Sequence, residues 1–525
     1  MTKIFKYVGS LGEIHGVQGD DVIQFSGVKY ASLANRFAKS ELLGHNVGNS
    51  CDMEFSIIQH SLPKPEFSIS ELGGLHLNIT VPLVDNEMPR PETKLPVFVF
   101  IHGGAFAMGS NAWPQYSQAR LVKLSAELGK PVIGVGINYR LGVLGFLTSA
   151  ELRAEGYESN NGLRDQMTAL RWIKKNIGGF GGDGENVTVI GESAGSVSGM
   201  HLLHSPEPLF KRLVGMSGSP LMLPPLSPPV TEFAYAAVIQ ALELSHLSSA
   251  GRVEALLKVP IKTLLEKIPP MVPLMPVIDG TLIPGLSTFA QISSEAIESA
   301  FPLPGKLWCE ALMVGDCQLD ATIITPMLEP RLTNIGGFFT SSLTSYLTSS
   351  QAAKILSAYS ITPSTPDAPA LRAILRFATD IGFLAPTISL ANGWPGAAYV
   401  YHFNEPNPWD GPWKGEAGHI LDVAFLFQNF SEFLEEGQKE SARTFAADFI
   451  HFVNGKAPWQ EWAPGKGAKV YGPSVADEGV KCHWIAYADD RPTVESGRES
   501  TILQLAEEIP LDEMAAAWGA FLQGR

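Results

Sequence analysis

A serine that could serve as a nucleophile lies in residues 191–195, which read Gly-Glu-Ser-Ala-Gly. The apolar run Val-Thr-Val-Ile at 187–190 precedes this G-x-S-x-G pattern, and a helix-like stretch follows it. The two glycines allow a sharp, strained turn from a strand into a helix, and this turn lifts the Ser193 hydroxyl clear of the sheet. The same pattern also arises by chance in glycine-rich chains, so its interpretation depends on partners elsewhere in the sequence.

A second pair of glycines could supply the donors that ester chemistry needs. The apolar run 95–101 predicts a buried strand, and His-Gly-Gly-Ala-Phe follows it at 102–106. Ester cleavage passes through a tetrahedral oxyanion, which requires preorganised N–H donors. We expect the backbone N–H groups of Gly103, Gly104 and Ala194 to form this oxyanion hole. Taken alone, His-Gly-Gly fits an ordinary tight turn better, and it is the pairing with Ser193 that favours the hole.

The order of residues along the chain selects a candidate base. Where a serine occupies such a strand-to-helix turn, the acid and then the histidine follow it in sequence. Of the twelve histidines, five precede the serine, two follow it too closely, and His246 lies in an amphipathic helical stretch before the last strands. This leaves four candidates: His402, His419, His451 and His483. Residues 397–403 resemble a strand, so His402 is expected to be packed or hydrogen-bonded. His419 ends a loop at 404–418 that is rich in Pro, Gly, Trp and Asn, and this position favours it as the base.

The acid is expected to leave the preceding strand. Residues 310–315 predict that strand, and it opens into a loop that carries both Asp316 and Asp320. Asp279 and Asp380 are rivals elsewhere in the chain. A carboxylate in this role fixes the tautomer of the imidazole and stabilises the imidazolium that forms during catalysis. The residues alone do not separate Asp316 from Asp320.

Composition excludes several classes of function. The net charge of −15 and the pI near 5.3 argue against nucleic-acid binding and against anionic membranes. We recognise no metal-ligand cluster and no nucleotide motif, and the glycine-rich residues 179–184 lack the Lys-Ser/Thr ending of a phosphate-binding loop. The sequence therefore predicts an enzyme that uses neither a cofactor nor a metal.

The cysteines and the apolar runs of the sequence indicate where in or outside the cell the protein is located. Cys309 and Cys317 bracket one predicted strand and cannot bridge, and the chain has four cysteines in all. No run approaches the ~20 apolar residues of a membrane helix, and residues 1–7 lack the apolar core of a signal peptide. We expect no transmembrane segment and a cytoplasmic protein, or a secreted one if a leader precedes the chain.

Several further motifs together resemble the type-B carboxylesterase/lipase family, which includes cholinesterases and fungal lipases. They are Gly-Val-Lys-Tyr-Ala at 27–31 with Arg-Phe at 36–37, Leu-His-Leu-Asn-Ile at 75–79, Asn-Tyr-Arg-Leu-Gly-Val-Leu-Gly-Phe-Leu at 138–147, and Asn-Gly-Leu-Arg-Asp-Gln at 161–166. The resemblance extends from about residue 27 to residue 471. It implies an α/β-hydrolase fold, with a central, mostly parallel sheet flanked by helices.

The resemblance also implies roles for particular residues. Family members carry G-x-x-x-x-E-G after the acid strand, and this offset from Gly315 places the acid at Asp320. Asp replaces the more common Glu at this position, and Ala321 replaces the usual Gly. The positions that match Glu192 and Ser217 supply polar groups near the histidine in the family.

By length the chain could form two or three domains, but large α/β enzymes often form one core with insertions and no linker is recognisable, so we expect a single domain over residues 1–525. We expect cap or insertion regions at 221–300 and in parts of 325–395, with a helix near 232–245 between two proline-dense patches. Residues that could line a substrate pocket are aromatic in the loop before the histidine and mostly methionine in the cap: Trp409, Trp413, Met222, Leu226, Met271 and Met275. Packing of these side chains as loop anchors or cap core is an equally good interpretation.

The sequence thus predicts a serine carboxylic-ester hydrolase that acts through Ser193, His419 and Asp320 on a hydrophobic small-molecule ester. An acyltransferase, a lactonase or a thioesterase could use the same triad, because an acyl-enzyme reacts with whichever nucleophile enters. A non-catalytic adhesion protein of the same fold is a remote alternative, because such relatives lose the nucleophile that this chain retains.

Overall fold

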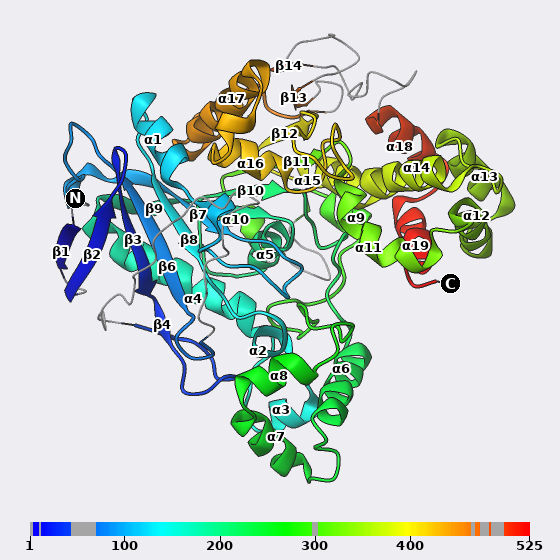
Figure 1. Cartoon of the computed structure of the whole chain (residues 1–525), viewed down its shortest axis with the longest axis horizontal. Helices are drawn as coiled ribbons and strands as arrows, with labels where there is room; N and C mark the ends of the chain where they lie inside the picture. Colours follow the sequence, from blue (N-terminus) through cyan, green and yellow to red (C-terminus); the bar gives the residue numbers. More distant parts are fainter. Residues whose placement is uncertain are drawn as a thin grey trace.

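A computed structural model describes residues 4–9, 12–43, 70–296, 303–463, 468–472, 482–484 and 498–524. Cys51 and the last residues of the expected cap region at 221–300 lie outside the described residues. Figure 1 shows a large twisted sheet at the left of the view, with helices packed around it and two helical groups extending below it and to its right.

Twelve of the described strands form one sheet in the order β1-β2-β3-β6-β8-β7-β9-β10-β11-β12-β13-β14. The seven strands in the middle of this order, from β8 through β7 and β9 to β13, run parallel to one another. Strands β1, β2, β3, β6 and β14 pair antiparallel at the two edges. The strands are β1 (Ile4–Gly9), β2 (Gly12–Gln18), β3 (Val22–Lys29), β6 (His76–Pro82), β7 (Leu95–Ile101), β8 (Ile133–Ile137), β9 (Gly182–Glu192), β10 (Arg212–Met216), β11 (Ala311–Cys317), β12 (Ala397–Phe403), β13 (Lys469–Tyr471) and β14 (Cys482–Trp484). The predicted central, mostly parallel sheet is confirmed.

Both faces of the sheet are covered, because strand β7 sends alternate side chains into two separate cores. Val97 and Val99 point into the core beneath α4 (Asn161–Asn176) and α5 (Ala194–Leu202). Phe98 and Phe100 point into the core beneath α1 (Ala119–Glu127), α16 (Leu421–Phe427) and α17 (Glu436–Val453). A nearly continuous apolar strand is the pattern expected for a parallel sheet buried on both sides.

The remaining helices form two groups beside the sheet (Figure 1). The first joins α6 (Pro228–Ala241), α7 (Ser249–Lys258) and α8 (Ile261–Lys267) to α2 (Gly142–Phe146) and α3 (Ala150–Ala154) around a core of its own. The second joins α12 (Ile335–Tyr346), α13 (Ser349–Ala358) and α14 (Asp367–Thr379) to α18 (Arg498–Ala506) and α19 (Leu511–Leu522). Short helices complete the chain: α9 (Phe289–Ile292), α10 (Gly305–Trp308), α11 (Thr325–Leu328) and α15 (Ala385–Asn392).

The helix expected near 232–245 begins and ends earlier than the sequence pattern suggests. It starts at Pro228, where a proline at the first helical position needs no hydrogen-bond partner for nitrogen. It ends at Ala241, and Glu243 then takes a left-handed backbone conformation (φ 63°). The proline-dense patch is therefore the start of the helix rather than a boundary before it.

One helical segment, Asp367–Asn392, is long and apolar enough to cross a membrane, although the sequence analysis expected none. It comprises α14, a π-helical turn η6 (Asp380–Leu384) and α15. In its most apolar window, 89% of the residues are buried within the protein. This burial is typical of a core helix, and the segment is accordingly no clear transmembrane span.

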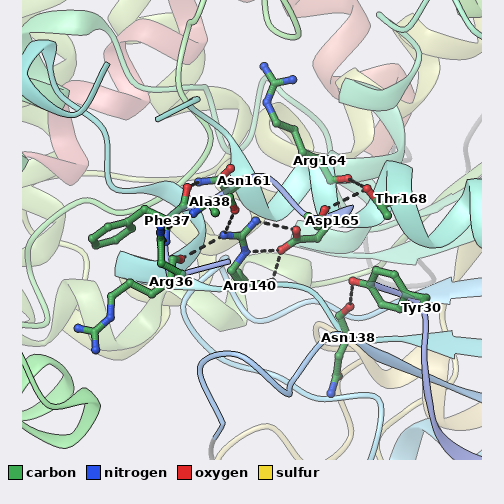
Figure 2. A network of polar contacts seen from close by, with 12 residues as sticks. Tyr30, Arg36, Phe37, Ala38, Asn138, Arg140, Asn161, Arg164, Asp165 and Thr168 are labelled. Carbon is green, nitrogen blue, oxygen red and sulfur yellow. Dashed lines mark hydrogen bonds and ion pairs between the residues drawn. The ribbon is translucent and has the colours of Figure 1, made fainter. Parts of the chain in front are cut away.

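A buried ion pair joins three motifs of the family resemblance (Figure 2). Arg140 meets Asp165 of α4 through two parallel hydrogen bonds of 2.7 and 2.8 Å, and both residues are buried. The same guanidinium donates to the carbonyls of Arg36 and Ala38. Asn161 donates to the carbonyl of Phe37. The N-terminal segment is therefore attached to α4, the helix that precedes strand β9.

Candidate active site

Ser193 lies at a strained turn between β9 and α5. Its backbone angles are φ 54° and ψ −122°, which non-glycine residues rarely adopt. A Cβ on Gly195 would stand 1.9 Å from the carbonyl oxygen of Ile101, and a Cβ on Gly191 would stand 2.2 Å from the backbone of Gly195. Both glycines of the G-x-S-x-G pattern are therefore required by close backbone contacts, and the predicted turn is present.

The residue after the serine begins helix α5. The N–H of Ala194 belongs to the first turn, whose donors have no partner within the helix, and the helix dipole places positive potential there. The hydroxyl of Ser196, two residues further along α5, donates to the carbonyl of Gly218 at 2.7 Å. These features make the start of α5 a suitable place for a developing negative charge.

The glycine pair after β7 lies against this turn. A Cβ on Gly103 would stand 3.0 Å from Cβ of Ser193 and 2.5 Å from Oε2 of Glu192. Gly104 has φ 106°, and a Cβ there would meet the carbonyl oxygen of Met108 at 2.2 Å. The next residue, Ala105, also has a positive φ, of 52°. Only residues without side chains fit at 103 and 104, as an oxyanion hole beside Ser193 requires.

His102 supports this loop rather than acting in the reaction. It is fully buried, its ring stacks on Tyr139 with centroids 4.6 Å apart, and the Tyr139 hydroxyl donates to its carbonyl at 2.8 Å. Burial lowers the pKa of His102 to about 4, so its imidazole is neutral at physiological pH.

The expected base and acid are in contact. Nδ1 of His419 lies 2.8 Å from Oδ1 of Asp320, which is fully buried at the start of the 3-10 turn η4 (Asp320–Ile324). The N–H of Cys317 donates to the other carboxylate oxygen at 2.7 Å. The N–H of His419 donates to Oγ1 of Thr322, which attaches the histidine loop to the acid loop. The long loop predicted at 404–418 is present between β12 and His419.

The second ring nitrogen of His419 faces Glu192. Nε2 lies 3.1 Å from Oε1 of Glu192, and it makes no hydrogen bond with the Ser193 hydroxyl. Burial acts to lower the pKa of His419, but the hydrogen bond to Asp320 and the nearby Glu192 outweigh burial and raise the pKa to about 10. Glu192 thus lies next to the histidine, as the resemblance implies.

Ser217 is the other residue to which the family resemblance gives a role, and it reaches His419 only through other residues. It is fully buried with φ 48°, its N–H donates to the carbonyl of Gly315, and its hydroxyl lies 4.0 Å from the sulfur of Cys317. Cys317 in turn holds Asp320. Ser217 therefore contacts the acid loop rather than the imidazole.

The other candidate acids and bases from the sequence analysis have different partners or lie elsewhere in the fold. Asp316 is paired with His402 at 2.6 Å. The carboxylate of Asp279 accepts from Asn160 and from the backbone of a turn, and that of Asp380 accepts from the Tyr359 hydroxyl. His451 lies in the last turn of α17. The side chain of His483 lies outside the described residues.

Asp422 is a buried group to which sequence reasoning gave no separate role. It lies on α16, and its carboxylate accepts a hydrogen bond of 2.8 Å from the Tyr401 hydroxyl. Burial and then the neighbouring Asp320 raise the pKa of Asp422 to about 7. The four buried carboxylates of the site are Glu192, Asp316, Asp320 and Asp422. Nonetheless, no group of three or more His, Cys, Asp or Glu in the part of the chain described here could hold a metal ion.

A largely apolar pocket of about 920 Å³ reaches His419. Its walls include Trp409 and Trp413 from the histidine loop, together with Phe430 and Phe433. The two tryptophans therefore lie where the sequence analysis suggested, beside the candidate base. Of the residues considered in the cap, Met271 is 93% exposed and lines no such pocket.

Comparisons with known proteins agree with this architecture. The model of the carboxylesterase family matches residues 7–498, and the chain belongs to that family. It is 28% identical over 534 residues to bile salt-activated lipase of Homo sapiens, covering 92% of this chain and 64% of the lipase. It is 44% identical over 140 residues to lipase 1 of Geotrichum candidum, covering 25% of this chain and 24% of that protein. It is 36% identical over 221 residues to para-nitrobenzyl esterase of Bacillus subtilis, covering 40% and 42%.

The chain thus spans less than two thirds of the length of these curated relatives. Among solved structures, a carboxylesterase of Geobacillus stearothermophilus is similar with a TM-score of 0.69 and 24% identity, over 89% of this chain and 95% of that one. A PNB esterase is similar with a TM-score of 0.67 and 23% identity over the same shares. These structures share the α/β-hydrolase fold that the sequence resemblance implied.

Proposed function

We propose that this protein is a serine carboxylic-ester hydrolase in which Ser193 is the nucleophile, His419 the base and Asp320 the acid. The observation that carries the proposal is the buried His419–Asp320 pair, with Nδ1 and Oδ1 separated by 2.8 Å, next to a strained serine turn. Three groups that are far apart in sequence contribute to one site at the carboxyl ends of β9, β11 and β12.

Acylation begins when Oγ of Ser193 attacks the ester carbonyl and His419 accepts the hydroxyl proton. The negative charge that develops on the carbonyl oxygen is stabilised by the N–H groups of Gly103, Gly104 and Ala194. His419 then gives the proton to the alkoxy oxygen as the carbonyl carbon–oxygen bond breaks, and the alcohol leaves. Water attacks the acyl-enzyme by the same route and releases the acid.

This sequence of steps requires Nε2 of His419 to exchange Glu192 for the Ser193 hydroxyl. In the structure Nε2 is 3.1 Å from the Glu192 carboxylate. Catalytic hydrogen bonds are often loose before the substrate binds and tighten in the complex. We propose that the ester, by excluding water and contacting the turn, favours the neutral imidazole that can accept a proton from serine.

The pocket beside His419 supports a hydrophobic small-molecule ester as substrate. Its aromatic walls, Trp409, Trp413, Phe430 and Phe433, offer large apolar contacts and few charges. The leaving alcohol must lie near the imidazole that protonates it. A bulky apolar alcohol group would bury these walls, and a small one would leave them in contact with water.

We further propose that residues 221–300 and parts of 325–395 cap the site. Phe383 of η6 packs edge-to-face on the His419 ring, with centroids 5.6 Å apart. Met222 approaches the same turn, because a Cβ on Gly382 would stand 4.0 Å from its Cγ. We also propose a reducing compartment on the cysteine pattern, since the buried Cys309 and Cys317 are not joined by a disulfide bond.

Hydrolysis of p-nitrophenyl esters from acetyl to palmitoyl, with Ser193→Ala measured in parallel, tests the proposal. We expect kcat to fall by about 10⁴- to 10⁶-fold in Ser193→Ala and a fluorophosphonate to label only the parent. Turnover that is equal in the two proteins would refute the assignment of the nucleophile. Addition of an alcohol acceptor separates hydrolysis from acyl transfer, since a transferase forms a new ester in place of the free acid.

A further inference from the structure

A second histidine–aspartate pair is buried beside the candidate active site. Asp316 and His402 are partners in the parallel ladder between β11 and β12, and both are fully buried. Nδ1 of His402 lies 2.6 Å from Oδ1 of Asp316. Along β11, Asp316 continues the face that Leu312 and Val314 present to an apolar core. Burial of a charge in such surroundings is costly unless the charge is paired.

This pair lies at the point where the two catalytic loops leave the sheet. Cys317 directly follows Asp316, and its N–H holds Oδ2 of Asp320 at 2.7 Å. The loop after His402 carries His419, whose N–H bonds to the segment that begins with Asp320. A shift of the strand ends would therefore move the hydrogen bonds that hold the acid and the base together.

The charge of Asp316 also acts on the site. Burial raises the pKa of Asp320, His419 lowers it, and Asp316 raises it further. The carboxylates that face His419 are Glu192 from β9 and Asp320 from η4, with Asp422 from α16 at longer range. Asp316 thus adds a further negative charge near Asp320, and negative charges nearby favour the imidazolium form of a histidine.

We propose that Asp316 and His402 are positioning residues for the candidate triad. The pair fixes the end of β11, so that Cys317 holds Asp320 against His419. The sequence alone gave Asp316 only the role of a rival acid. The inference rests on the proposed hydrolase function for its kinetic part only.

Asp316→Asn tests the proposal, because it keeps the side-chain volume and removes the charge. We expect kcat to fall by about 10- to 100-fold with KM changed less than about twofold, as displacement of a catalytic group predicts. We also expect the imidazole of His419 to titrate at lower pH, measured by NMR of ¹⁵N-labelled histidine and assigned with His419→Gln. The matched control is Asp448→Asn, which removes a carboxylate that accepts from the Tyr471 hydroxyl on the next strand, β13. It should change neither quantity.

A folded Asp316→Asn with the parent kcat and the parent titration of His419 would overturn the proposal, as would an equal loss in Asp448→Asn. If Asp316→Asn does not fold, the double variant Asp316→Leu/His402→Phe removes both polar groups of the pair together, so that neither is left buried without the other. Full kcat and an unchanged titration in the double variant would overturn the proposal, whereas a lower kcat with a shifted titration supports it. If neither variant folds, the pair is required for folding, and the proposal of a positioning role is overturned.

The titration needs no turnover. A parent protein that cleaves no ester would refute the proposed function, while the titration of His419 in Asp316→Asn would still decide whether the pair acts on the histidine.

Discussion

Glu192→Gln removes the carboxylate nearest to the outer nitrogen of His419. The two groups are 3.1 Å apart, and their side chains are 5% exposed for His419 and 2% exposed for Glu192. Unit charges at that separation attract by about 5 kcal/mol at an effective dielectric constant of about 20. One pH unit corresponds to about 1.4 kcal/mol, so even a third of this attraction moves the titration of His419 by about one pH unit.

The direction follows from the charge that is lost. Burial lowers the pKa of His419, whereas Asp320 and Glu192 raise it, and the net result is a pKa of about 10. Without the Glu192 charge the neutral imidazole persists to lower pH, so the acid limb of kcat/KM moves to lower pH. The imidazolium formed in the transition state also loses a stabilising charge, so the plateau of kcat/KM falls by roughly 10-fold.

The assay is kcat/KM for a p-nitrophenyl ester between about pH 5 and pH 11, in the parent and in Glu192→Gln. Glu185→Gln on the same strand is the matched control, because Glu185 is 75% exposed and pairs with Lys174 on the surface. An acid limb that stays in place in Glu192→Gln, or that moves to higher pH, would refute the argument that Glu192 holds His419 in its charged form.

Three further predictions follow from the packing. Gly195→Ala would place a Cβ 1.9 Å from a backbone carbonyl oxygen, so we expect a loss of about 2 kcal/mol or more in unfolding free energy. Gly519→Ala in α19, where the Cβ meets nothing within 4 Å, should instead stabilise slightly; equal midpoints in urea would contradict this contrast. Asp165→Asn leaves the Arg140 charge buried and should cost about 3 kcal/mol, measured by urea unfolding, and a midpoint equal to the parent's would argue against the pair. Trp409→Ala should raise KM several-fold for naphthyl esters and leave KM for ethyl acetate nearly unchanged. An unchanged KM for the naphthyl esters would place the pocket outside the substrate path.

The elements that carry the site could be predicted where the local pattern was sufficient. β7 (Leu95–Ile101) and β12 (Ala397–Phe403) have the predicted bounds, because each is a largely apolar run that a polar residue follows. The order of serine, acid and histidine then reduced the choice of base to a few candidates. The contact between His419 and Asp320 agrees with the choice made from order and from the family offset.

The contacts across the sheet could not be predicted, because they depend on strand order and register. Asp316 meets His402 only because β11 and β12 are neighbours with these two residues opposite each other. Asp316 is still within the strand and faces the core, whereas Asp320 begins the next turn, and this difference in direction separates the two acids. The approach of Glu192 to His419 likewise joins residues on elements that no local pattern connects.

The order of strands across the sheet has a consequence for the chain during its synthesis. The proposed nucleophile and its oxyanion donors come from β7 and β9, and the proposed acid and base follow β11 and β12, beyond the helices of the 221–300 region. Strands β9 to β13 are neighbours in the order in which they leave the ribosome. A nascent chain therefore presents Ser193 before it has the histidine proposed to activate it, and the proposed hydrolytic activity requires that the last parallel strands have joined the sheet.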